Sequence, residues 1–126
     1  MRPSIGIVGT GKVGGTLARL WHAAGYDVVA IFSRTTAHAE QLASFVDAQV
    51  VAQPSVVVAR ANLTVLSVPD DAIQPVAEAI QLENAAGKAV IHTSGAHSVD
   101  VLATLAEQGV QVGSLHPAFP FADVER

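Results

Sequence analysis

The sequence predicts an α/β protein in which helices cover both faces of a parallel sheet. Short apolar runs alternate with helical patterns of about 10 to 15 residues, a rhythm typical of right-handed crossovers between parallel strands. The first run leads into a glycine-rich segment, residues 9–14. Half of the 126 residues are hydrophobic and 14% are charged, as in a well-buried globular domain.

The expected strands are apolar runs bounded by glycine, proline or polar residues. Such runs are typical of strands buried on both faces of a sheet. In chain order they cover residues 4–8, 28–32, 49–51, 63–68, 88–92 and 110–115. Six parallel strands suit a complete Rossmann fold with the strand order 3-2-1-4-5-6.

The expected helices lie between these runs, where apolar side chains recur at helical spacing. They cover residues 12–24, 36–45, 70–82 and 98–108. Gly25 ends the first helix, Pro75 lies near the start of the third, where proline is tolerated, and Ser98 is a natural cap for the fourth. The segment after Pro54 is open between a brief helix and a strand, because its valines are β-branched.

Composition excludes several classes of protein. The net charge of −4 offers no basic stripe for nucleic acid, and no apolar run approaches the roughly 18 residues of a membrane span. Without cysteine there is no disulfide, thiolate metal site or cysteine nucleophile, which is compatible with a reducing cytoplasm. The five histidines lack an HExxH pattern or a carboxylate cluster, so we expect no metal site. We expect a soluble cytoplasmic protein that binds neither nucleic acid nor a membrane.

The glycine-rich segment predicts a dinucleotide-binding loop, because it follows a strand and opens an amphipathic helix. We expect Gly9 to make the tight turn, Gly11 to let the backbone approach a pyrophosphate, and Gly14 to allow close helix–strand packing. The residues expected to hold the phosphates at the helix N-terminus are Gly9, Thr10, Gly11, Lys12, Val13 and Gly14. The alternative is a flavodoxin-like or other α/β domain whose glycine turn binds no ligand.

The residues after the second strand favour NADP(H) over NAD(H). A site for NAD usually has an acid about 20 residues after the loop, on the ribose hydroxyls. Here Ser33, Arg34 and Thr35 occupy that place, and Asp27 lies at the other end of the strand. A guanidinium binds a 2′-phosphate bidentately, and the two hydroxyls can donate hydrogen bonds to it. We therefore expect NADP, with NAD as an alternative; otherwise Arg34 is a solvated arginine beside a helix cap.

Two polar segments follow the fourth and fifth strands, at the edge where ligands of open α/β sheets bind. Ser67, Val68 and Pro69 are expected beneath the ribose and nicotinamide of the cofactor. Otherwise they form a plain strand-to-helix turn. Thr93 and Ser94 belong to a small-residue loop that admits the nicotinamide or a substrate, or that is only a turn and helix cap.

Histidines are the remaining candidates for chemistry. His116 ends the last strand beside His92 on the neighbouring strand, and an imidazole suits general acid–base work in hydride transfer. The alternative, a histidine hydrogen-bonded to loop backbone, is favoured for His92 and open for His116. We expect His22 and His38 on helix surfaces away from this edge. The candidate catalytic residues are His116 and, from the small-residue loop after the fifth strand, Ser94.

Together these motifs resemble the NADP-binding part of the 6-phosphogluconate dehydrogenase-like superfamily. The glycine loop and its helix look like those of pyrroline-5-carboxylate reductases, 3-hydroxyisobutyrate dehydrogenases and deazaflavin-dependent NADP oxidoreductases. Ser33-Arg34-Thr35 is similar to the segment that reads the 2′-phosphate in several of them. Segments 66–73, 92–96 and 113–117 look most like a branch of unknown function that joins a Rossmann-like domain to a helical C-terminal domain. His116-Pro117 also resembles the His-Pro of prephenate dehydrogenases, although Ala-Phe-Pro-Phe follows it here.

The resemblance implies an NAD(P)-binding domain at residues 1–116 and, at 117–126, an exit segment towards a helical domain absent from this chain. Exposed Phe119 and Phe121 suggest pairing with another copy or another chain through this segment, or packing on that helical domain. The expected function is NADP(H) binding in an oxidoreductase that transfers hydride between nicotinamide and a small carbonyl, imine or alcohol. The alternative is a non-catalytic NAD(P)-binding module, sensor or subunit that needs a partner chain. A third option is a structural remnant that binds nothing tightly.

Overall fold

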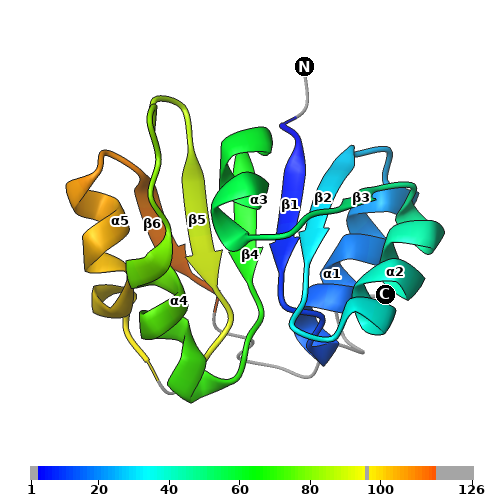
Figure 1. The fold of residues 1–126 in the computed structure, drawn as a ribbon, viewed down its shortest axis with the longest axis horizontal. Helices are drawn as coiled ribbons and strands as arrows, with labels where there is room; N and C mark the ends of the chain where they lie inside the picture. Colours follow the sequence, from blue (N-terminus) through cyan, green and yellow to red (C-terminus); the bar gives the residue numbers. More distant parts are fainter. Residues whose placement is uncertain (1–2, 96, 116–126) are drawn as a thin grey trace.

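The computed structural model describes residues 3–95 and 97–115. Its sheet has six strands in the order β3-β2-β1-β4-β5-β6, all of them parallel (Figure 1). The strands are β1 (Ile5–Val8), β2 (Val28–Phe32), β3 (Gln49–Val50), β4 (Leu63–Leu66), β5 (Ala89–His92) and β6 (Gln111–Ser114). The predicted fold class and strand order are confirmed.

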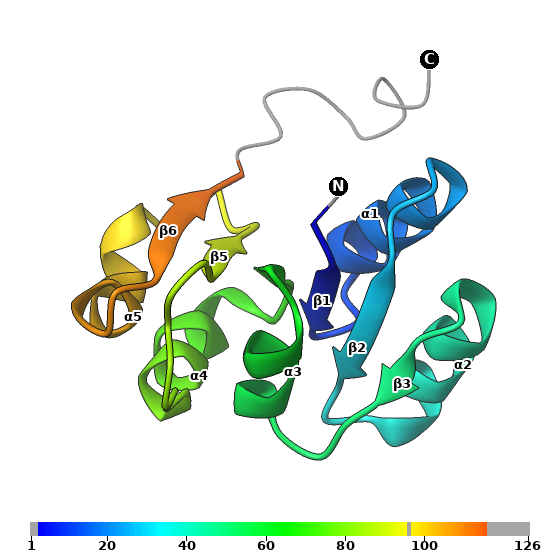
Figure 2. The same cartoon turned by 90° about the horizontal axis from the view of Figure 1, so that it is seen from above.

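The helices lie on both faces of the sheet, with α1 and α2 on one face and α3, α4 and α5 on the other (Figure 2). The α-helices are α1 (Lys12–Ala23), α2 (Thr36–Val46), α3 (Pro54–Arg60), α4 (Ile73–Ala79) and α5 (Ala103–Glu107). Two 3-10 helices, η1 (Asp70–Ala72) and η2 (Val99–Leu102), precede α4 and α5. No helix in the described ranges is long and apolar enough to cross a membrane. Location in the cytoplasm stays a prediction.

Two helix predictions were wrong in extent, since the spans expected at 70–82 and 98–108 each begin as a 3-10 turn and are shorter. The helix α4 stops where Ile80 takes an extended conformation and becomes fully buried. The next two amides, of Gln81 and Leu82, donate to the side chains of Ser55 and Gln108. Long-range acceptors therefore replace the last helical turn that the local pattern suggests.

The segment after Pro54 is a helix, which settles the alternative that the sequence left open. Pro54 is at its first turn, and Val57 and Val58 are fully buried against the sheet. This packing needs Gly6 on β1, because a Cβ there would lie 2.5 Å from the Val57 Cγ1 atom. Burial of the valines in the core therefore outweighs their preference for strands.

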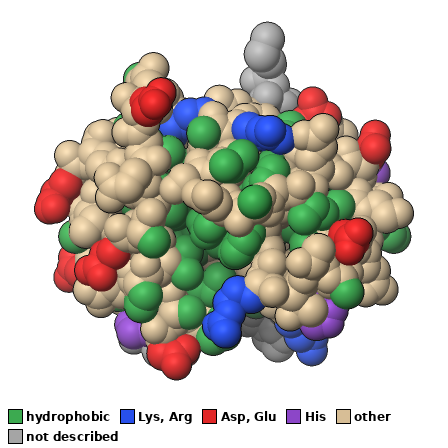
Figure 3. Space-filling view, viewed as in Figure 1, with side chains coloured by type: hydrophobic (Ala, Val, Ile, Leu, Met, Phe, Trp, Pro, Cys, Tyr) green, Lys and Arg blue, Asp and Glu red, His purple; other side chains and the backbone are tan. Residues whose placement is uncertain are grey.

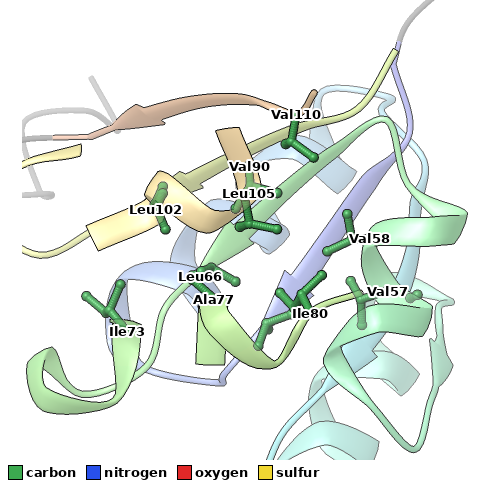
Figure 4. Close-up of a cluster of buried hydrophobic side chains, with 12 residues drawn as sticks. Val57, Val58, Leu66, Ile73, Ala77, Ile80, Val90, Leu102, Leu105 and Val110 are labelled. Atoms are coloured by element: carbon green, nitrogen blue, oxygen red, sulfur yellow. The ribbon is translucent and has the colours of Figure 1, made fainter. Parts of the chain in front are cut away.

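The sheet divides the hydrophobic core into two clusters. Along β1, Ile5 and Ile7 face α1 and α2, whereas Val8 belongs to the cluster beneath α3, α4 and α5. Figure 4 shows this second cluster, in which Leu66 of β4 lies among side chains of the covering helices. Because helices cover both faces of the sheet, the strands are held in place. Their carboxyl ends all lie at the same edge, the lower edge in Figure 1, where the predicted site residues gather.

Candidate functional site

A cleft of about 730 Å³ lies at the carboxyl edge of the sheet, where the loops after β1, β2 and β4 meet. This volume is within the range usual for small-molecule and cofactor sites. Its lining residues are Val8, Gly9, Thr10, Gly11, Lys12, Val13, Phe32, Ser33, Arg34, Thr35, His38, Ser67, Val68, Pro69, Asp70, Ala72, Val76 and Thr93. All the residues predicted to bind a cofactor line it except Gly14 and Ser94. The strand topology therefore brings segments that are far apart in the sequence to one surface.

Ser67, just after β4, holds the glycine loop in place. The amide of Gly14 donates to the Ser67 hydroxyl at 2.9 Å, and the amide of Gly11 donates to the Ser67 carbonyl at 3.3 Å. A Cβ on Gly14 would lie 2.5 Å from the Ser67 Cβ, and one on Gly11 would lie 2.9 Å from the carbonyl oxygen. Gly9 has a φ of +90° and faces the same carbonyl. All three glycines thus lie too close to Ser67 to carry a side chain. The close packing expected at Gly14 is confirmed, and Ser67 is the partner that the sequence analysis did not name.

Three amides of the loop have no hydrogen-bond partner among the described residues: those of Thr10, Lys12 and Val13. The first turn of a helix has no preceding carbonyls within the helix to satisfy its N–H groups. Gly11, the N-cap of α1, provides no side-chain acceptor, and the first turn contains no acid. The loop therefore presents free donors, with the positive end of the helix dipole, to an anion in the cleft.

The loop after β2 forms the next part of the wall. The Ser33 hydroxyl accepts the Thr35 amide at 3.2 Å and is hydrogen-bonded to the Thr10 hydroxyl at 3.1 Å, which joins this loop to the glycine loop. Arg34 is exposed and has no hydrogen bond or ion pair within the described ranges. Its guanidinium donors are therefore available to a ligand.

Two features of the cleft were missed by the sequence analysis. Phe32 and Val76, which were not predicted, join the predicted Val68 as partly buried side chains that give the cleft an apolar wall. Seen from the side of Figure 1, the surface is hollowed where hydrophobic side chains gather, and Lys or Arg atoms border the lower part of the hollow (Figure 3). The prediction that His38 lies away from this edge was wrong. Because α2 begins directly after the β2 loop, its first turn borders the cleft.

The loop after β5 is tied down by backbone hydrogen bonds. His92 is fully buried: its Nε2 donates to the Ser98 carbonyl at 2.9 Å, and its Nδ1 accepts the Ser94 amide at 3.1 Å. The interpretation of His92 as a histidine bonded to loop backbone is therefore confirmed. Ser94 is buried and does not line the cleft, whereas Thr93 does. His116 and the segment 117–126 lie outside the described residues.

The charges around the cleft favour an anionic ligand. The cations Lys12 and Arg34 line it, against Asp70 as the one acid among the described lining residues. The carbonyl of Asp70 accepts a hydrogen bond at 2.9 Å from Nε2 of His97, which joins the loops after β4 and β5. The arrangement suits a long ligand with phosphates at the glycine loop, a further anionic group near Arg34 and a flat ring against the apolar wall.

Comparison with known proteins agrees with this geometry. The family described as "Rossmann-like domain" matches residues 1–117. A search of curated proteins found no match. Among solved structures, an imine reductase from Pseudomonas sp. is 25% identical, with a TM-score of 0.76 over 92% of this chain and 41% of that one.

Two further structures have the same fold. A protein named as an NADP oxidoreductase from Bacteroides fragilis is 24% identical, with a TM-score of 0.72 over 94% of this chain and 44% of that one. A 3-hydroxyisobutyrate dehydrogenase from Mycobacterium tuberculosis is 19% identical, with a TM-score of 0.71 over 89% of this chain and 39% of that one. The chain spans less than half the length of each of these three proteins.

The family match and the shared fold of these neighbours confirm the Rossmann-like domain that the sequence resemblance implied. The family match covers nearly the whole chain, and the strand order and the glycine loop agree with it. The chain therefore belongs to the Rossmann-like domain family.

Proposed function

We propose that this chain binds NADP(H) in the 730 Å³ cleft, with the pyrophosphate on the free amides of Thr10, Lys12 and Val13 and the 2′-phosphate on Arg34. One observation carries the proposal: Arg34, which has no partner among the described residues, shares a cleft with three loop amides that have none there either. An acid at that position would repel a 2′-phosphate, and the loop after β2 contains none.

The proposed reaction is hydride transfer between the nicotinamide and a small carbonyl, imine or alcohol. When bound, the cofactor supplies the hydride chemistry, and the residues of this chain bind and orient it. Arg34 follows β2 and Thr93 follows β5, so they lie at opposite ends of the cleft along the sheet. We assign the adenosine to the Arg34 end and the nicotinamide to the Thr93 end. The oxidoreductase names of the structural neighbours support this class of reaction.

A second candidate function is a cofactor-binding module that needs a partner for catalysis. It is favoured by the loop after β5, where both ring nitrogens of His92 are occupied and Ser94 is buried. His116 remains the proposed acid–base group, and residues 117–126 remain the proposed exit towards a helical domain or a second copy. Turnover of NADPH with a panel of cyclic imines and ketones, and of NADP⁺ with a panel of alcohols, separates the candidates, because binding without any turnover supports the module.

The test of cofactor binding is calorimetric titration with NADPH and NADH. We expect NADPH to bind more tightly than NADH. Arg34→Ala should weaken NADPH binding by about 10- to 100-fold, the loss typical of hydrogen bonds to a charged group. The affinity for NADH should change little. Arg60→Ala is the matched control, because Arg60 is exposed at the end of α3, does not line the cleft and donates a hydrogen bond to Gln49. Equal losses for both cofactors would refute the 2′-phosphate site, and no saturable binding below millimolar would refute the proposal as a whole.

A further inference from the structure

His38 stands at the junction of two hollows. It lines the large cleft together with Arg34, and it also lines a smaller groove of about 230 Å³ between α1 and α2. Thr10 is shared by both hollows as well, and its hydroxyl is bonded to that of Ser33. An anion bound beside Arg34 at the start of α2 would therefore lie on the side of the cleft that His38 borders.

The charged groups that share a hollow with His38 come from three parts of the chain. Arg34 lies on the loop before α2, and Lys12 lies at the start of α1. Arg19 of α1 lines the smaller groove, but its guanidinium stacks over the Phe45 ring at 4.9 Å. Asp70, at the start of η1, is the acid among the described residues that line the cleft.

The His38 ring has no hydrogen bond or ion pair within the described ranges, and no acid lines the smaller groove. Its surroundings are thus mainly cationic, and an anionic ligand is the partner that suits it.

We propose that His38 is a second, pH-dependent cation for the 2′-phosphate, so that the preference for NADP(H) over NAD(H) weakens as the pH rises. This inference rests on the proposed function. Histidine is the side chain that ordinarily changes charge between about pH 5 and 8. As an imidazolium it attracts the phosphate and donates from both nitrogens, and as a neutral ring it does neither fully.

The direction in which the preference for NADP(H) changes with pH distinguishes a contribution of His38 from the ionisation of the ligand's own phosphate. A phosphate monoester loses its second proton near pH 6, so its own ionisation strengthens binding as the pH rises. A decline in the preference above about pH 6.5 must therefore come from the protein. NAD(H) lacks the 2′-phosphate but shares the pyrophosphate and adenine contacts, so the ratio of the two dissociation constants isolates this position.

The experiment measures the Kd of NADP⁺ and of NAD⁺ by calorimetry between pH 6 and 9 at constant ionic strength. In the wild type we expect the ratio Kd(NAD⁺)/Kd(NADP⁺) to fall by about three- to tenfold, the range between exposed ion pairs and charged hydrogen bonds. His38→Gln should flatten the decline, and His38→Lys should keep the ratio high to pH 9. His22→Gln is the matched control, because His22 is exposed in the last turn of α1 and lines neither hollow.

The outcomes separate the inference from the proposed function. A flat ratio in the wild type, or an equal decline in His38→Gln, overturns the role of His38 while an Arg34-dependent affinity for NADP⁺ still supports the site. Failure of NADP⁺ to bind overturns both. Circular dichroism of each variant across the same pH range checks that any change in the ratio occurs in folded protein.

Discussion

The hydroxyl of Ser67 accepts the amide of Gly14 at 2.9 Å, so a side chain at the end of β4 occupies a donor of the first turn of α1. The same residue accepts the Gly11 amide through its carbonyl. One residue thus fixes both sides of the glycine loop and leaves its other first-turn amides, of Lys12 and Val13, directed to the cleft. The cradle is formed before any ligand arrives, which lowers the entropy lost on binding.

Ser67→Ala is therefore expected to lower the free energy of unfolding by about 1–3 kcal/mol, because the buried Gly14 amide loses its acceptor. Urea unfolding monitored by circular dichroism measures the change. Ser44→Ala on the exposed side of α2 is the control, with an expected change below about 0.5 kcal/mol. If the two variants are equally stable, the hydrogen bond contributes nothing and the loop is held by packing alone.

The adjacent glycines of α1 are expected to respond in opposite directions to alanine. A methyl group at Gly14 would meet the Ser67 Cβ at 2.5 Å, whereas one at Gly15 has nothing within 4 Å. Gly14→Ala should destabilise the fold by about 1–3 kcal/mol through overpacking. Gly15→Ala should stabilise it by about 0.5–1 kcal/mol, because alanine is the better helix former. Thermal unfolding of both variants checks this, and loss of stability in Gly15→Ala would contradict it.

The strand order could be predicted because it depends only on the alternation of strand and helix patterns along the sequence. Apolar runs alternating with amphipathic helices permit few arrangements once crossovers are right-handed. The end of α4 could not be predicted, because it depends on acceptors 26 residues away: Ser55 for the Gln81 amide and Gln108 for the Leu82 amide. No local pattern contains that information.

The candidate site divides in the same way. Arg34 was predicted because the position after β2 has a defined role in this fold, and the structure places it on the cleft. His38 was missed although a signal existed: it lies four residues after Arg34, so a helix starting at Thr36 carries it back to the same edge. The predicted strand order already placed β4 beside β1, but the bond from the Gly14 amide to the Ser67 hydroxyl depends on side-chain geometry that residue spacing does not give.

Thr64→Val is expected to stabilise the protein by about 1 kcal/mol. Thr64 is fully buried on β4, and its Oγ1 atom has no hydrogen-bond partner among the described residues. Valine has the same shape without the desolvated hydroxyl, and it favours a strand. The measurement is the urea midpoint at an unchanged m-value. A fall in that midpoint would mean that the hydroxyl has a partner in solution.

The two lysines of the chain are expected to separate stability from binding. The ammonium group of Lys88 donates to the carbonyls of Ala59 at 2.7 Å and Ala61 at 3.1 Å, at the end of α3, where the last carbonyls of a helix lack partners. Lys12 instead lines the cleft at the start of α1 and has no such bonds in the described ranges.

Lys88→Met should therefore lower the free energy of unfolding by about 1–2 kcal/mol, since the two carbonyls lose a charged donor while the apolar stem is kept. Its Kd for NADPH should stay unchanged. Lys12→Met should leave the unfolding free energy within about 0.5 kcal/mol of the wild type. It should weaken NADPH binding several-fold, because a cation is removed beside the pyrophosphate. Calorimetry and urea unfolding give a Kd for NADPH and a free energy of unfolding for each variant. If both variants lose stability and affinity together, Lys12 also supports the fold, and its assignment to the cleft as a ligand group is wrong.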